Sequence, residues 1–284
     1  MVNFNGAILE TASNFLNENQ RGLRFGDILF EELRVMNGNL VFWEEHYFRL
    51  MASMRILRME IPTVFTMEYL ESEILKTIEQ NDVLNNSALI TFAVFRNFSQ
   101  SLLPKTNQVS WFISCQALTS SFYTIDEEPY EVELFKDFLV NQDMLTNLNT
   151  NNKTIAVTAS IFAEENGYAD SIVLNTSKHV VGTTQGAIFL AKDKVIKTPP
   201  LSSGVKNEVI RTKIIEIIER SEDITLIEEA ISPFELQKAD ELFAVNIALG
   251  IVPISKYRKK TYQNEMGRKI LGKLNAQARM TSLK

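Results

Sequence analysis

The sequence predicts a mixed α/β (α+β) protein of two domains, and three observations support this class. The chain has 284 residues, enough for one large domain or two of ordinary size. Apolar runs typical of strands are interspersed with segments of helical period. A polar, acidic segment at residues 119–129, which contains two serines and a proline, is typical of an interdomain linker. We therefore expect domains at residues 1–118 and 130–284.

Five strands and two helices are expected in the first domain. Asn37-Gly38 between two apolar runs is a strong hairpin signal. Thr66 is placed to cap a helix whose apolar residues follow the 3.6-residue period. The expected strands span residues 2–5, 28–36, 39–42, 88–96 and 109–118, and the expected helices span residues 44–59 and 66–78. This domain is thus predicted to be a sheet covered by two helices.

Strands and helices alternate along the second domain. The helix expected at residues 207–220 carries an apolar stripe that includes Val209, Ile210 and Ile214. The other expected helices span residues 154–165 and 264–274, and the expected strands span residues 130–135, 171–174, 187–191, 195–197, 225–228 and 241–246. This alternation predicts an α/β domain.

The composition is that of an ordinary globular protein, with 45% apolar and 23% charged residues. No apolar run approaches the ~20 residues that cross a bilayer. Residues 1–6 lack the basic and apolar regions of a secretory signal. The single cysteine, Cys115, cannot form an internal disulfide. We therefore expect a reduced, cytoplasmic protein that does not enter a membrane.

The net charge of −6 conceals a basic C-terminal segment. Residues 256–284 hold nine Lys or Arg against one acid, Glu265. The segment has no block of like charges and no interleaved aromatic platform, so a solvated helix face is expected rather than a nucleic-acid site. The two histidines, His46 and His179, are too few and too far apart in sequence to indicate a metal cluster. No nucleic-acid partner and no metal are expected.

A series of separated motifs runs through nearly the whole chain. They are RGLRFGD at residues 21–27, LFE at 29–31, EHYFRL at 45–50, KTPPL at 197–201, a helix containing Arg211, ADELF at 239–243 and GIVPI at 250–254. In this order they resemble the class IV aminotransferase family, which includes D-amino-acid and branched-chain aminotransferases and aminodeoxychorismate lyase. The resemblance implies the fold type IV architecture of D-amino-acid aminotransferase, with pyridoxal phosphate (PLP) in a cleft between two α/β domains of a homodimer.

The resemblance also implies a lysine that forms a Schiff base with the cofactor aldehyde. An ungapped alignment puts Asn149, which has no nucleophilic amine, at the position of this lysine. The alignment is anchored on Asn152, Ala159, Ala163 and Gly167. The only nearby lysine is Lys153, which is either a displaced catalytic residue or an ordinary lysine in the first turn of a helix.

The pyridine nitrogen of the cofactor is paired with a glutamate in the family, so that the ring acts as an electron sink. The matching position holds Gly182, and Ala187 takes the place of the asparagine that follows. The family's Gly-Ile-Thr-Arg phosphate cup corresponds here to Glu208, Val209, Ile210 and Arg211. A glutamate about 4 Å from a phosphate would cost roughly 4 kcal/mol per charge pair in a partly screened site.

Two further phosphate positions, which hold Thr or Ser in the family, correspond to Ile247 and Ala248, and neither side chain has a donor. The family's phosphate-binding arginine is retained as Arg49. Arg49 is either an anion clamp or a structural arginine paired with Glu44 or Glu45.

These losses concern one site, whereas the motifs of the core and turns persist. We therefore expect a family member that has lost PLP catalysis, lacks bound PLP, and binds a small anionic ligand or a protein partner. One alternative is an active PLP-dependent aminotransferase or aminodeoxychorismate lyase that uses Lys153. Another is a different enzyme that reuses the cleft without PLP. Whether the chain is an enzyme stays open at this point.

Overall fold

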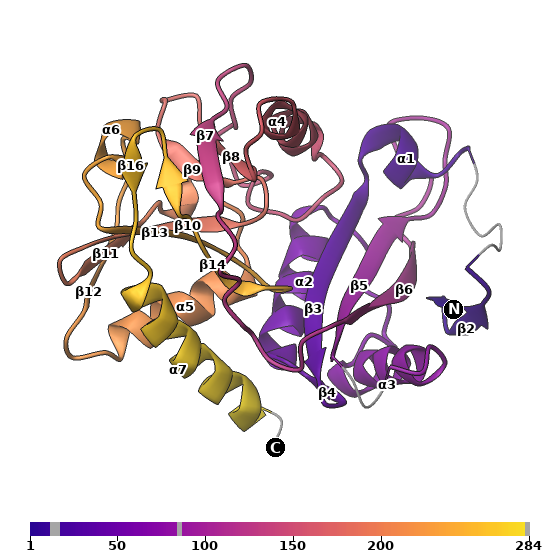
Figure 1. Ribbon diagram of the computed structural model, residues 1–284. Coiled ribbons are helices and arrows are strands. Elements are labelled where there is room, and N and C mark those ends of the chain that lie inside the picture. The colour runs from indigo at the N-terminus through magenta and orange to yellow at the C-terminus, as the bar shows by residue number, and fades with distance from the viewer. Residues whose placement is uncertain (12–17, 84–86, 282–284) are drawn as a thin grey trace. The chain divides into compact units, whose positions relative to one another are not determined.

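The computed structural model describes residues 1–11, 18–83 and 87–281 of the chain (Figure 1). Its contacts group the residues into two compact units. Unit 1 comprises Met1–Phe122, Asn149–Asn152 and Ala278–Lys284, and unit 2 comprises Tyr123–Leu148 and Lys153–Gln277. Among the helices described, none is both long and apolar enough to cross a membrane.

Unit 1 is built on a six-stranded antiparallel sheet in the order β2-β1-β6-β5-β3-β4. Its strands are β1 (Val2–Phe4), β2 (Ala7–Leu9), β3 (Ile28–Met36), β4 (Asn39–Leu40), β5 (Ser87–Arg96) and β6 (Val109–Leu118). The predicted bounds of β3 and β6 are confirmed. Asn37 and Gly38 form the turn between β3 and β4, and both have positive φ, as the Asn-Gly signal predicts.

Two helices, α2 (Trp43–Ile56) and α3 (Met67–Glu79), cover one face of this sheet. Directly opposed residues on neighbouring strands share a face, so Glu31 of β3 lies on the same face as Phe92 of β5. Glu31 contacts α2, and the Trp111 ring on this face packs against Tyr69 of α3. The Thr66 hydroxyl accepts the Tyr69 N–H at 3.1 Å, which confirms the predicted cap of α3. The short helix α1 (Arg21–Phe25) contacts β5.

Unit 2 contains a ten-stranded mixed sheet in the order β12-β11-β10-β9-β8-β7-β15-β16, with β13 paired to β10 and β14 paired to β13. Its strands are β7 (Glu131–Leu134), β8 (Asp170–Leu174), β9 (Val180–Thr183), β10 (Ala187–Lys192), β11 (Val195–Thr198), β12 (Thr225–Glu228), β13 (Glu241–Asn246), β14 (Gly250–Pro253), β15 (Lys256–Tyr257) and β16 (Lys260–Thr261). The bounds of β12 and β13 are as predicted. Strands β9, β14, β15 and β16 were not predicted: β15 and β16 have two residues each, and β9 and β14 each contain a glycine, which is unfavourable in a strand.

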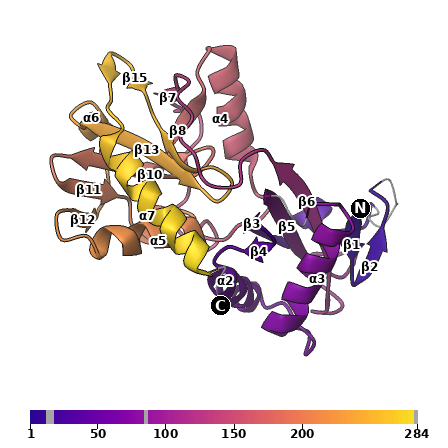
Figure 2. The same cartoon turned by 60° about the horizontal axis from the view of Figure 1, so that its bottom comes forward.

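The helices of unit 2 are α4 (Thr154–Glu165), α5 (Val209–Glu219), α6 (Pro233–Leu236) and α7 (Glu265–Thr281). Helix α4 has its predicted bounds and packs on β8. Helices α5 and α7 lie beside each other (Figures 1 and 2), and the Lys273 amine of α7 meets the Ser221 hydroxyl at 2.5 Å. The buried Glu241 carboxylate accepts the N–H groups of Met266 and Gly267 at 2.7 and 3.0 Å. This contact explains the glutamate of the ADELF motif, because an anion at a helix N-terminus satisfies the unpaired donors there.

Candidate functional site

Asn149, at the predicted lysine position, is held against β3 within unit 1. The Phe30 N–H donates to the Asn149 carbonyl at 2.8 Å, and Thr150 forms a bridge with Leu29. The Asn149 side-chain amide donates to the Glu32 carboxylate at 3.4 Å. The position therefore carries a hydrogen-bonding amide fixed beside a carboxylate, and it offers no nucleophile.

Lys153 is the N-cap residue of α4 and belongs to unit 2. Its carbonyl accepts the Val157 N–H at 2.9 Å, which is the first hydrogen bond of the helix. The side chain is half-buried. Lys153 thus lies at the start of the helix.

Gly182, at the predicted position of the pyridine carboxylate, is surrounded by backbone atoms. It pairs with Ala187 across the β9–β10 hairpin, and the neighbouring Thr183 N–H donates to the Gly186 carbonyl at 2.9 Å. A Cβ atom on Gly182 would lie 2.7 Å from the Gly186 carbonyl oxygen. A Cβ on Gly186 would in turn lie 2.0 Å from the Val245 carbonyl oxygen. The hairpin and β13 are packed so closely that no side chain fits at Gly182 without a shift of the backbone.

The turn after β13 carries Ile247 and Ala248, which replace the family's hydroxyl residues. The Asn246 side-chain oxygen accepts the N–H groups of Ala248 and Leu249 at 3.1 and 2.9 Å. The Ile247 carbonyl accepts the Tyr123 hydroxyl at 3.1 Å. The N–H of Ala248 is thus engaged within the turn, and the two side chains there supply no donor for an anion.

The residues at the N-terminus of α5 do not favour the binding of an anion. Glu208 is the N-cap residue and brings a carboxylate to the end of the helix where an anion would be stabilised. Val209 and Ile210, in the first turn, are 6% and 1% exposed and belong to the core. Arg211 donates to the Pro199 carbonyl at 2.9 Å and to the Glu228 carboxylate at 2.6 Å, so its charge is paired within unit 2.

Arg49 lies in a buried cluster with Glu31 and His46 in unit 1. Its guanidinium donates to both carboxylate oxygens of Glu31, at 3.0 Å from Nε and 2.6 Å from Nη2. The His46 Nδ1 lies 2.5 Å from the same carboxylate. The side chains of Glu31 and His46 are 2% and 1% exposed, and that of Arg49 is 15% exposed. The retained arginine thus neutralises a buried carboxylate from β3.

The ionisation of this cluster is set by burial and by its charges. Burial favours the neutral imidazole and lowers the pKa of His46, although the Glu31 carboxylate opposes that shift. Burial raises the pKa of Glu31, but the Arg49 charge and the His46 hydrogen bond outweigh it, so the pKa lies below its usual value. A neutral His46 therefore donates from Nδ1, and its buried Nε2 has no hydrogen-bond partner among the described residues.

Acidification should destabilise the fold through this cluster. The pKa of His46 is lower in the folded protein than its unfolded value of 6.5. The free energy of unfolding therefore carries no penalty from His46 above pH 6.5, and it decreases as the pH falls below that value. The Glu31 contribution is lost further down, below 4.5. We expect the free energy of unfolding to fall between pH 7 and 5 by up to about 1.4 kcal/mol per pH unit. Urea denaturation at several pH values should show a shallower fall for His46→Gln than for the wild type. A His46→Gln profile equal to that of the wild type would contradict the assignment.

Sequence reasoning missed Glu31 and Glu32 as partners of the site positions. The available signal was two consecutive acids inside an apolar strand, LFEEL at residues 29–33. Because successive side chains of a strand point to opposite faces, Glu31 meets α2 and Glu32 meets Asn149. The described residues contain no group of three His, Cys, Asp or Glu side chains that could hold a metal ion.

Comparisons with known proteins agree with this architecture. The model of the amino-transferase class IV family matches residues 28–257. The chain is 22% identical to D-alanine aminotransferase of Bacillus licheniformis, over 92% of this chain and 89% of the relative. It is 25% identical to aminodeoxychorismate lyase of Vibrio harveyi, over 83% of this chain and 84% of the relative.

A solved structure shares the fold. The branched-chain amino acid aminotransferase of Thermobaculum terrenum, solved in its PLP form, superposes with a TM-score of 0.83 at 19% identity, over 99% of this chain and 94% of that one. The predicted fold type IV architecture is therefore confirmed. Since the family model spans most of the sequence, the chain belongs to the class IV aminotransferase family.

Proposed function

We propose that this chain is a class IV aminotransferase-like protein that has lost PLP-dependent catalysis and acts by binding a small anionic ligand or a protein partner. The observation that carries the proposal is the backbone packing at Gly182, where a Cβ would lie 2.7 Å from the Gly186 carbonyl oxygen. The backbone at this position therefore leaves no space for a side chain on residue 182 itself.

The residues present do not fit the cofactor. PLP supplies an electron sink when a lysine holds its aldehyde and a carboxylate keeps its ring nitrogen protonated. Asn149 offers an amide already directed at Glu32. Gly182 offers no charge, and Glu208 places a negative charge at the helix end that would receive the phosphate. Arg49, the retained arginine, is engaged by Glu31.

The competing function is an active aminotransferase or aminodeoxychorismate lyase that uses Lys153. Purified protein, incubated with PLP and then separated from unbound PLP by gel filtration, should show no absorbance band near the visible edge. It should transfer no amino group from D-alanine or a branched-chain amino acid to a 2-oxo acid, and it should not cleave aminodeoxychorismate. Activity that the Lys153→Ala variant abolishes would establish the competing function instead.

Restoring the lysine alone should not restore activity. In Asn149→Lys, the new amine faces the Glu32 carboxylate, which replaces the 3.4 Å amide contact with an ion pair. The Gly182 position still lacks the carboxylate that activates the ring. We expect no aminotransferase or lyase turnover and no PLP-dependent absorbance band.

The variant Asn149→Lys/Glu32→Gln is the control, because it removes the competing carboxylate without adding the missing one. Its amine should also give no turnover. Turnover by Asn149→Lys would show that this one substitution removed the chemistry, and turnover by the double variant alone would show that Glu32 also had to change. Either result would contradict the proposed loss at the remaining positions.

We also propose that the protein is a cytoplasmic homodimer, as the family resemblance implies. The single cysteine, Cys115, is free, and a chain without an internal disulfide is typical of a reducing compartment. Sedimentation at several concentrations tests the dimer, and a monomer throughout would contradict it.

A further inference from the structure

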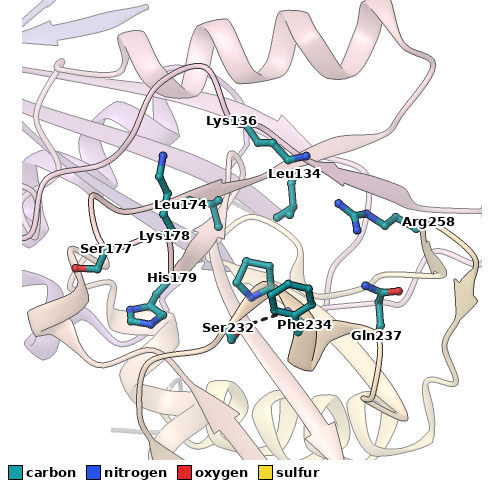
Figure 3. A pocket seen from close by; sticks show the side chains of 11 residues that line it. Leu134, Lys136, Leu174, Ser177, Lys178, His179, Ser232, Phe234, Gln237 and Arg258 are labelled. Carbon is teal, nitrogen blue, oxygen red and sulfur yellow. Dashed lines mark hydrogen bonds between the residues drawn. The ribbon is translucent and has the colours of Figure 1, made fainter.

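A pocket of about 440 Å³ opens on unit 2 (Figure 3). Its walls come from the ends of β7 and β8, the turn before β9, helix α6 and the end of β15. None of the positions that the family resemblance assigns to PLP lines it. The volume falls within the range of small-molecule sites.

Three cationic side chains line this pocket, namely Lys136, Lys178 and Arg258, and no Asp or Glu does. Arg258 has a long contact of 3.5 Å with the Glu133 carboxylate at the protein surface, and such exposed pairs are weak. Lys136 and Lys178 form no ion pair with any residue that the structure describes. Three cationic side chains therefore line one small space, and the Arg258–Glu133 contact is the single ion pair they make among the described residues.

The base of the pocket is apolar. Leu134 and Leu174 are each 5% exposed, whereas the Phe234 side chain is 75% exposed. In Figure 3, Lys178 and Arg258 stand on opposite sides, with Leu134, Leu174 and Phe234 between them. An exposed aromatic ring beside buried leucines offers contact area to a flat apolar group.

The turn that carries Lys178 is held rigidly in an unfavourable conformation. Lys178 has φ of +63°, a left-handed conformation that costs a non-glycine residue about 1–2 kcal/mol. The fully buried Asn175 fixes the turn, because its side-chain oxygen accepts the Ser177 and His179 N–H groups at 3.1 and 3.0 Å. Its amide also donates to the Ser203 carbonyl at 3.0 Å. A lysine thus stands where a glycine would be more stable, and such strain gathers at binding sites.

We propose that this pocket binds a small aryl carboxylate. The ring lies on Phe234 against the two leucines, and the carboxylate lies at the side of the pocket that Lys178 lines. The Lys178 amine donates charge-assisted hydrogen bonds to the carboxylate, and Lys136 and Arg258 add to the positive charge of the pocket. The proposal does not depend on the loss of PLP chemistry, since the pocket shares no residue with those positions.

Calorimetric titration of the full chain tests the proposal with a matched pair of probes. Indole-3-acetate carries both the ring and the charge, and indole-3-acetamide is its neutral counterpart of the same size. We expect the acetate to bind roughly tenfold or more tightly than the amide, because charge-assisted hydrogen bonds are lost in the amide.

Three variants locate the site. Lys178→Gly removes one cation and relieves the left-handed strain, so the fold should be retained while affinity for the acetate falls roughly tenfold. Phe234→Ser should weaken both probes, because the ring contact is common to them. The control is Lys238→Gln, which changes an exposed charge next to α6 without lining the pocket, and it should leave both affinities unchanged.

Several results would overturn the assignment. These are absence of acetate binding, equal affinity for acetate and amide, or a loss in Lys238→Gln as large as that in Lys178→Gly. Tighter binding of an acidic peptide than of the acetate, with the same dependence on Lys178, would make the pocket a protein-docking site instead.

Discussion

Gly182→Glu, which restores the family's carboxylate, should destabilise the protein by about 4 kcal/mol or more. The new Cβ would lie 2.7 Å from the Gly186 carbonyl oxygen, so the β9–β10 hairpin must shift. The backbone at Gly186 has little room to move, because it is itself packed against the Val245 carbonyl. The carboxylate would enter a strand whose residues are all buried, without a basic partner provided for it.

Two control variants separate the causes of this loss in urea denaturation. Gly182→Ala adds only the Cβ and should cost about 1–3 kcal/mol through overpacking. Gln185→Glu adds the same charge at an exposed position of the same hairpin and should change stability by less than about 0.5 kcal/mol. A Gly182→Glu protein as stable as the wild type would show that the hairpin opens readily, and the argument from backbone packing would fail.

Arg49→Met should cost about 3–5 kcal/mol, the usual effect of removing one partner of a buried ion pair. The substitution keeps the apolar stem of the side chain but leaves the Glu31 carboxylate, 2% exposed, without its bidentate partner. The same change at Arg55, an exposed residue of the same helix, should have an effect below about 0.5 kcal/mol.

The double variant Glu31→Gln/Arg49→Met tests whether the two side chains act as a pair. The double variant should lower the free energy of unfolding by less than the sum of the two single variants, because neither buried charge is then left unpaired. In the absence of added anions, equal free energies of unfolding for Arg49→Met and Arg55→Met would contradict the structural role of Arg49. Arg49 would then be an anion-binding residue.

Much of the fold could be predicted because its longer elements have clear periods. Strands β3 and β6 and helix α4 have the expected bounds, since each combines a sustained apolar pattern with a turn or polar flank. The four-residue strand β9 was missed because its VVGT sequence is too short for a period and contains glycine. Helix α7 extends to Thr281, beyond its expected end, because polar residues in its last turns weaken the apolar signal.

The residue identities of the candidate site could be predicted from the sequence, whereas the contacts around them could not. The substitutions that we propose to have removed the chemistry, at positions 149 and 182, are residue identities, and an aligned sequence is sufficient to recognise them. The Glu32 contact and the Gly186 packing arise from segments brought together only by folding. Tyr123 is a further example, because it lies in the polar segment expected to be a linker. Its ring is buried against Gly250, where φ is +78° and a Cβ would lie 2.7 Å from the ring.

We propose that the chain does not hold PLP covalently. Borohydride reduction of the protein incubated with PLP, followed by peptide mass mapping, measures this, because reduction fixes any lysine adduct. We expect no pyridoxyl group on Lys153 above the level found on an exposed surface lysine such as Lys238. Stoichiometric labelling of Lys153 would contradict it and would make the chain a PLP enzyme with a displaced lysine.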